Sequence, residues 1–99
     1  YQSAFARVKG ISLLSEPKNC QSNYWLQTLL LDKTEFENRD IILESTNKTG
    51  IMTRPAWVLM NELEPFKGFP SMDLATAKSL SERIINIPSS PGLTLVNNV

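Results

Sequence analysis

The longest apolar run, residues 23–32 (NYWLQTLLLD), is the feature that most constrains what this chain can fold into. Aromatic and leucine side chains fill most of its positions, which predicts a β-strand. A run this continuous is typical of a strand buried on both faces, with Tyr24 and Trp25 packing on opposite sides of its start. The other elements must therefore cover this strand.

The segments before this run predict one helix, one strand and one loop. Apolar residues recur at near-helical spacing over residues 1–8. Residues 11–16 (ISLLSE) predict a short strand that ends at Pro17. Residues 18–22 show no periodicity and predict a loop.

A helix is predicted after the apolar run. Thr34 and Glu37 have the spacing of a capping box, and Gly50 stands where a left-handed helix end is favoured. The apolar stripe of this helix consists of Phe36, Ile42, Leu43 and the methyl group of Thr46, with the stem of Arg39 along it.

The segment after Gly50 predicts a strand over residues 51–54. This strand should end at Pro55, which has no backbone N–H to donate. Residues 56–70 predict an irregular segment with a short helical turn around residues 59–63.

The last third of the chain predicts one more helix and strand. Asp73 is a good N-cap, and the apolar spacing that follows keeps Arg83 in the last helical turn, where a cation suits the helix dipole. Residues 84–87 predict a strand that ends at Pro88.

The element order β-β-α-β-α-β predicts an α/β (α+β) fold, with helices packed on one face of a small mixed or antiparallel sheet. A length of 99 residues allows one domain, so we expect residues 1–99 to form a single domain with a frayed tail at residues 93–99.

Charge and residue content exclude several classes of function. Ten basic and ten acidic side chains cancel, so we expect neither a nucleic-acid nor a membrane partner. Cys20 is the only cysteine and no signal peptide is recognisable, so we expect a cytoplasmic protein. The sequence has no histidine, which excludes a Ser-His-Asp triad and histidine metal sites, and we expect no metal.

The lysines do not suggest a covalent catalyst. A Schiff-base lysine needs a desolvated pocket, and each of the six lysines lies in a polar loop, at a helix end or on an exposed helix face. We therefore expect no catalytic residue in this chain.

Arg54 and Trp57 are the strongest candidates for a binding site. Arginine is the preferred partner of carboxylates and phosphates, and tryptophan offers a flat stacking surface. Both follow a strand on an irregular segment, where binding residues concentrate. The alternative is that they only pack and solubilise a strand end.

Three blocks of the sequence resemble a known family. They are residues 22–32 (SNYWLQTLLLD), 50–61 (GIMTRPAWVLMN) and 83–91 (RIINIPSSP). They are similar to the C-terminal part of the pyridoxal phosphate (PLP)-dependent sugar aminotransferases of the DegT/DnrJ/EryC1/StrS type, in particular the LegC enzymes. The middle block also resembles the perosamine synthases.

This resemblance implies the C-terminal small domain of a fold-type I, aspartate-aminotransferase-like enzyme. The complete enzyme would be a homodimer whose N-terminal large domain carries the PLP-binding lysine. It would move an amino group from glutamate onto a 4-keto nucleotide sugar, in the synthesis of a legionaminic acid or bacillosamine-like amino sugar. This chain, which starts at Tyr1, would be a fragment that is inactive alone.

The resemblance also implies a set of substrate-binding residues. Its middle block lines the sugar-nucleotide pocket, so Arg54, Trp57 and Asn61 would lie at the pocket wall. Arg54 would pair with the diphosphate or with the carboxylate of the amino donor, and Trp57 would pack on the sugar. Asn61 replaces the histidine that is usual in the family, so this position cannot titrate.

A rival hypothesis comes from a different class of function. Trp57, Phe66 and Phe69 would form the exposed anchor patch of a free-standing, non-catalytic interaction module. An upstream reading frame with the PLP-binding lysine would favour the enzyme, and a start codon directly before Tyr1 would favour the module.

Overall fold

The computed structural model describes residues 1–94. The backbone of residues 91–94 forms a 3-10 turn, η4 (Pro91–Thr94), which includes the first two residues of the predicted tail. The rest of that tail, residues 95–99, lies outside the described part of the chain.

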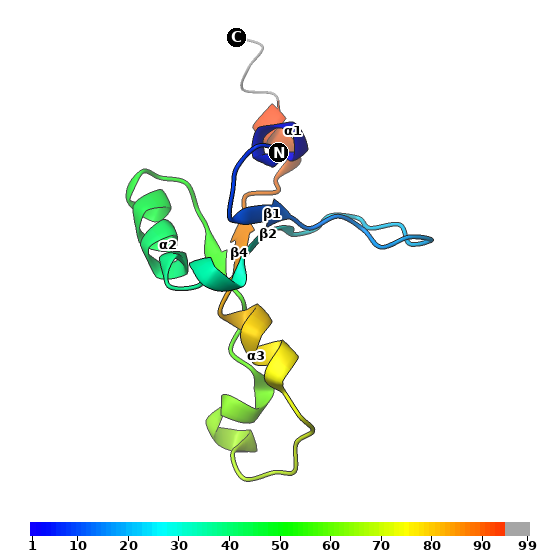
Figure 1. The fold of residues 1–99 in the computed structure, drawn as a ribbon, viewed down its shortest axis with the longest axis vertical. Helices are drawn as coiled ribbons and strands as arrows, with labels where there is room; N and C mark the ends of the chain where they lie inside the picture. The colour runs from blue at the N-terminus through cyan, green and yellow to red at the C-terminus, as the bar shows by residue number, and fades with distance from the viewer. Residues whose placement is uncertain (95–99) are drawn as a thin grey trace.

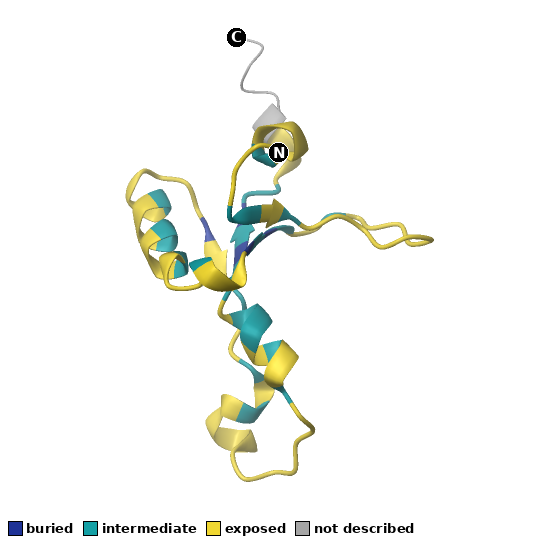
Figure 2. Ribbon diagram, viewed as in Figure 1, coloured by how far each residue is buried: buried dark blue, intermediate teal, exposed yellow. Residues whose placement is uncertain are grey.

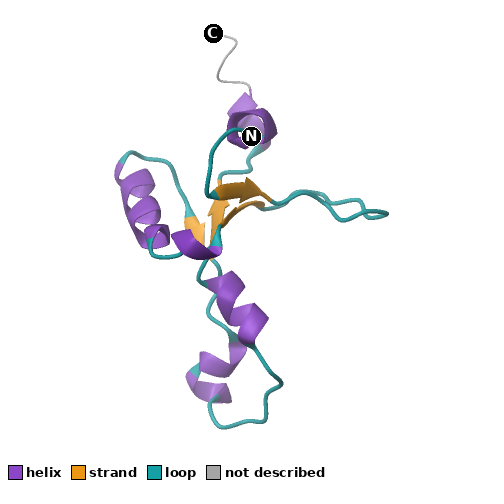
Figure 3. Ribbon diagram, viewed as in Figure 1, coloured by secondary structure: helices purple, strands orange, loops and turns teal. Residues whose placement is uncertain are grey.

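An antiparallel four-stranded sheet organises the chain, in the strand order β1-β2-β4-β3. Figures 1 and 3 show the strands at the centre of the molecule, with helices around them. Its strands are β1 (Ile11–Leu13), β2 (Gln27–Leu31), β3 (Arg54–Pro55) and β4 (Ile84–Ile87). The two central strands, β2 and β4, come from opposite halves of the sequence. The expected antiparallel sheet and element order are confirmed.

Helices surround this sheet on several sides (Figure 1). The α-helices of the described residues are α1 (Gln2–Phe5), α2 (Asn38–Lys48) and α3 (Ala75–Ser81). The other 3-10 turns are η1 (Lys33–Glu35), η2 (Met60–Glu62) and η3 (Glu64–Phe66). The turn η2 confirms the predicted helical turn around residues 59–63, and η3 follows it directly. No helix of residues 1–94 is long and apolar enough to cross a membrane.

One face of the sheet carries the hydrophobic core, and we call it the core face. Leu29 of β2 pairs with Ile85 of β4 and with Leu13 of β1. Side chains alternate along a strand, so every second residue joins this face. Its buried residues are Leu29, Leu31, Ile85 and Ile87, against which Phe5 of α1 and Ile42 and Leu43 of α2 pack.

The opposite face, which we call the open face, has no buried residue. Figure 2 shows the buried residues, in dark blue, on and next to the strands. It consists of Ser12, Thr28, Leu30, Arg54, Ile84 and Asn86, all exposed or half-buried. The prediction that β2 is buried on both faces is therefore wrong: burial alternates along it.

The predicted strand over residues 23–32 is too long at its start. β2 begins at Gln27 because side chains before it hold the backbone in turns. The N–H of Tyr24 donates to Ser22 Oγ at 3.0 Å, and the N–H of Trp25 donates to Asn23 Oδ1 at 3.0 Å. Tyr24 has a φ of 47°, which no strand residue adopts.

The strands predicted over residues 11–16 and 51–54 are also shorter than expected. β1 ends at Leu13, and Glu16 turns its carboxylate to the N–H of Ser22 at 2.6 Å. β3 begins only at Arg54, because the backbone oxygen of Thr53 accepts from Asn47 Nδ2 of α2 at 3.0 Å.

The predicted start of the helix after β2 is wrong, whereas its predicted end is confirmed. The capping box of Thr34 and Glu37 does not form; Glu35 accepts from Asn38 Nδ2 at 2.6 Å instead, and α2 begins at Asn38. Gly50 has a φ of 84°, and its N–H donates to the backbone oxygen of Asn47 at 3.1 Å, as in a Schellman motif.

The ends of α3 differ slightly from the prediction. Asp73 accepts from the N–H of Ala75 at 3.0 Å, so its carboxylate does serve the first turn. Arg83 lies beyond the last turn, since α3 ends at Ser81. Its guanidinium donates to the backbone oxygens of Ser79 and Leu31 and so joins α3 to β2.

Candidate functional site

Arg54 and Trp57 border the same pocket, which lies at the β3 edge of the sheet and which we call the strand-edge pocket. Its volume is about 240 Å³. It is lined by Trp25, Leu26, Met52, Arg54, Pro55, Trp57, Asn86, Ile87, Pro88 and Ser89. Two of the three predicted site residues are therefore close together.

Helix α2 fixes the position of Arg54 through the residue before it. Thr53 is buried, and its hydroxyl lies 2.6 Å from Thr46 Oγ1 and accepts from Asn47 Nδ2 at 3.0 Å. The next residue, Arg54, pairs with Asn86 across β3 and β4. These contacts place the arginine on the open face.

The guanidinium of Arg54 has no hydrogen-bond or ion-pair partner in the described part of the chain. Arg39, in contrast, contacts Asp40 and the backbone oxygen of Ser81, and Arg83 contacts two backbone oxygens. The lining of the strand-edge pocket contains this one cation and no carboxylate. Such a pocket attracts anions, above all carboxylates and phosphates.

Two tryptophans form aromatic walls of the pocket. Trp57 is 78% exposed and Trp25 is 67% exposed. Trp25 was predicted to pack in the sheet, and this prediction is wrong: the turn before β2 directs it outward, and Ser89 Oγ donates to its backbone oxygen at 2.6 Å. Exposed tryptophans beside an unpaired cation are typical of a ligand site.

Asn86 is a pocket residue that the sequence pattern did not reveal. It lies half-buried on β4, and its Oδ1 accepts a hydrogen bond from Thr28 Oγ1 of β2 at 2.8 Å. Neither Asn86 nor Trp25 carries a local signal, because only the pairing of β2, β3 and β4 brings them beside Arg54.

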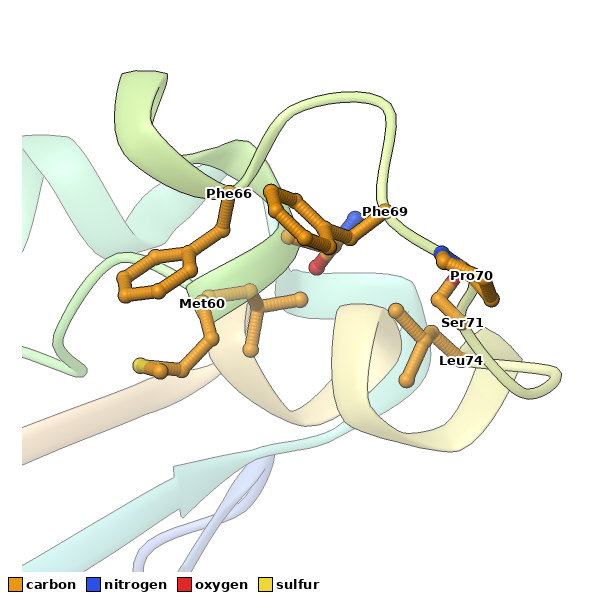
Figure 4. A pocket seen from close by; sticks show the side chains of 8 residues that line it. Met60, Phe66, Phe69, Pro70, Ser71 and Leu74 are labelled. Carbon is orange, nitrogen blue, oxygen red and sulfur yellow. The ribbon is translucent and has the colours of Figure 1, made fainter.

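The third predicted site residue, Asn61, lies in a different pocket. This lobe pocket of about 310 Å³ is mostly apolar (Figure 4). It is lined by Leu59, Met60, Asn61, Phe66, Phe69, Pro70, Ser71 and Leu74. The structure therefore does not join Asn61 to Arg54 and Trp57.

The three aromatic residues of the rival hypothesis, Trp57, Phe66 and Phe69, do not all line the same pocket. Phe66 and Phe69 line the lobe pocket together (Figure 4), whereas Trp57 lines the strand-edge pocket. The described residues thus do not gather these side chains around one pocket.

The side chains present do not fit a PLP-binding role. All six lysines are exposed. Lys48 pairs with Glu44 at 2.7 Å, and Lys67 pairs with Glu64. A lysine that forms a Schiff base needs a desolvated pocket, which none of these positions offers. Among residues 1–94, no group of three or more Cys, Asp or Glu side chains could hold a metal ion.

Comparison with known proteins identifies one family. The model of the DegT/DnrJ/EryC1/StrS aminotransferase family matches residues 1–98. No curated protein sequence matches the chain significantly.

Solved structures with the same fold include three aminotransferases or related proteins. Helicobacter pylori PseC, an aminotransferase involved in the biosynthesis of pseudoaminic acid, gives a TM-score of 0.76 at 20% identity, over 88% of this chain and 24% of PseC. DesI, solved in the presence of its TDP-sugar product, gives 0.77 at 22% identity, over 89% of this chain and 23% of DesI. The aminotransferase TlmJ from Streptoalloteichus hindustanus gives 0.72 at 16% identity, over 88% of this chain and 23% of TlmJ.

The chain thus spans about a quarter of the length of each of these structures. At these identities the similarity establishes the fold. The expected fold class, an antiparallel sheet with helices as in such aminotransferases, is confirmed.

Proposed function

This chain belongs to the DegT/DnrJ/EryC1/StrS aminotransferase family, and from that premise we propose that it is the C-terminal small domain of a PLP-dependent nucleotide-sugar aminotransferase. The complete enzyme transfers an amino group from glutamate to a 4-keto nucleotide sugar. This domain supplies part of the wall of the substrate pocket and is inactive alone.

The unpaired guanidinium of Arg54 beside Trp57 is the observation that carries this proposal. A nucleotide sugar combines flat and puckered rings with a diphosphate, and the strand-edge pocket combines aromatic walls with a cation. Arg54 binds the diphosphate or the donor carboxylate, and Trp57 packs on the sugar. Asn61, in the lobe pocket, contacts the substrate only if the ligand extends there.

The cofactor is assigned to another part of the protein. PLP supplies the electron sink of the reaction when it is bound. Because every lysine here is exposed, we assign the PLP-binding lysine to an N-terminal large domain of the same chain. This domain then has the role of binding and orienting substrate.

Finer features rest on the sequence resemblance alone. We propose a LegC-type substrate on the way to legionaminic acid or a bacillosamine-like sugar, a homodimeric enzyme and a cytoplasmic location. Blocks 22–32 and 83–91 support the LegC branch.

An activity screen of the full-length protein tests this function. We expect the visible absorbance of protein-bound PLP, and glutamate-dependent amination of at least one 4-keto nucleotide sugar. The function is wrong if the protein, saturated with PLP, aminates no 4-keto sugar in a panel of uridine-, thymidine- and guanosine-diphosphate sugars.

The role of Arg54 has its own test. Arg54→Ala in the full-length enzyme should raise the KM for the nucleotide sugar or for glutamate about tenfold, roughly the effect of one lost charge-assisted hydrogen bond. Arg7→Ala is the matched control, because Arg7 is also exposed and does not line the pocket. Equal kinetics of the two variants would return Arg54 to a purely structural role.

A further inference from the structure

We propose that Asn86, held by Thr28, is a second donor to the oxygen anion that Arg54 binds, and that this anion is the diphosphate of the nucleotide sugar. This inference rests on the proposed function and adds a specificity-determining pair to it. Neither Asn86 nor Thr28 is among the site residues that the sequence predicted.

The three residues form one row across the sheet. Arg54 of β3 pairs with Asn86 of β4, and Asn86 pairs with Thr28 of β2. Directly paired residues of antiparallel strands point to the same face, with Cβ atoms about 5 Å apart. The guanidinium and the amide therefore start from neighbouring positions on the open face.

The hydrogen bond from Thr28 determines which end of the Asn86 amide is available. Thr28 Oγ1 donates to Asn86 Oδ1 at 2.8 Å, so the acceptor oxygen of the amide is engaged. Its two Nδ2 hydrogens have no acceptor in the described part of the chain, and this nitrogen is not fully buried. Because the amide oxygen faces Thr28, the two N–H donors on the other side of the planar amide are the groups that face a ligand.

The row thus presents hydrogen-bond donors from Arg54 and from Asn86 without a competing carboxylate in the pocket lining. Both donor groups suit an oxygen anion that can accept several hydrogen bonds. A phosphoryl group and a carboxylate share this chemistry.

The aromatic walls favour the phosphoryl group over the carboxylate of glutamate. Trp25 and Trp57 line the same cavity of about 240 Å³, which is far larger than one carboxylate. A nucleoside diphosphate brings an aromatic base and a ribose together with its phosphates, and these rings can pack on tryptophan. Glutamate has no ring for either wall.

Calorimetric titration of the full-length protein with thymidine diphosphate and with uridine diphosphate tests the pair. Asn86→Leu should weaken binding of the better of these two probes about tenfold, because one hydrogen bond to a charged group is lost. Asn86→Asp keeps the shape but places a negative charge beside the phosphate, and should weaken binding about fiftyfold. Asn19→Asp, in the loop between β1 and β2, makes the same charge change at an exposed position outside the pocket and should leave binding unchanged.

Variants of Thr28 test the positioning role separately. Thr28→Val removes the hydroxyl and should weaken binding about threefold, whereas Thr28→Ser keeps it and should restore binding. The KM for the nucleotide sugar should rise in parallel while kcat and the KM for glutamate stay unchanged, because the contact is made equally in the ground and transition states.

The results separate this inference from the proposed function. If Arg54→Ala weakens binding of the diphosphate probe but both Asn86 variants keep the affinity of the unmodified protein, the inference is overturned and the function stands. A rise in the KM for glutamate alone in the Asn86 variants also overturns it. If the unmodified protein binds neither diphosphate, the inference is overturned, and the amination screen alone decides the proposed function.

Discussion

The two faces of the sheet are built from the same four strands but differ in almost every physical property. On the core face, Leu31 and Ile85 are 1% and 0% exposed, and α1 and α2 pack against them. On the open face, Arg54 is exposed without an ionic partner, and Trp25 and Trp57 stand beside it. The side chains of the core face pack against other parts of the chain, whereas the large side chains at the open face are mostly exposed.

This difference separates the residues that fold the chain from those that are available to a ligand. A buried aliphatic side chain contributes to stability through its transfer from water and its packing. An exposed tryptophan or arginine contributes little to folding and is available for contacts with a ligand. Substitutions on the two faces should therefore have opposite signatures.

The largest expected effect lies on the core face. Ile85→Ala should lower the free energy of unfolding by about 4 kcal/mol, because it leaves a cavity at a fully buried position. Urea denaturation followed by circular dichroism measures this. Ile41→Ala on α2 is the matched control, since Ile41 is 65% exposed and should cost under about 1 kcal/mol. If both variants lost the same free energy of unfolding, burial on the core face would not be what stabilises the chain.

An intermediate effect is expected where α2 meets β3. Thr53→Val keeps the shape but removes the hydroxyl that Thr46 Oγ1 and Asn47 Nδ2 contact, and should cost about 2 kcal/mol in the free energy of unfolding. Thr76→Val on exposed α3 should change it by less than about 0.5 kcal/mol. Because Thr53 precedes Arg54, we also expect a raised KM for the nucleotide sugar. A stable Thr53→Val variant would show that this network does not hold the strand.

The smallest expected effect on stability lies on the open face. Trp57→Ala should change the thermal unfolding midpoint of the full-length protein far less than Ile85→Ala, because Trp57 is 78% exposed in this domain. It should raise the KM for the nucleotide sugar about fivefold through the loss of one stacking contact. Trp57→Phe keeps an aromatic surface, so its KM for the nucleotide sugar should lie between those of the unmodified protein and Trp57→Ala. A lower unfolding midpoint with normal kinetics would assign Trp57 to folding.

Local signals in the sequence predicted the parts of the fold that depend on a few neighbouring residues. Gly50 ends α2 in the left-handed conformation that a helix end favours, and Asp73 serves the first turn of α3. The strand predicted over residues 84–87 is confirmed: its isoleucines favour a strand, and Pro88 follows its end.

Competition between nearby polar groups explains the local errors. The capping box at Thr34 fails because Glu35 and Asn38 pair instead. The strand expected from residue 23 fails because Asn23 and Ser22 bond to the backbone that follows them, which leaves Tyr24 with a positive φ. Propensity alone cannot weigh these alternatives.

The candidate site was accessible to sequence reasoning only in part. Arg54 and Trp57 are neighbours in the chain, so one irregular segment marks both. Trp25 and Asn86 lie about thirty residues from Arg54 in the sequence, and only the pairing of β2 and β3 with β4 brings them beside it, for which no local pattern exists. Asn61 is near Trp57 in sequence, yet the chain turns into η2 and carries it into the lobe pocket.

Amide hydrogen exchange of the full-length protein, with and without a saturating nucleoside diphosphate, tests the assignment of the open face most directly. We expect slower exchange at residues 23–26 and 56–59, which include Trp25, Leu26 and Trp57 of the pocket lining, and unchanged exchange in α2, which packs on the core face. Unchanged exchange at both pocket segments in the saturated protein, or protection confined to α2, would contradict it.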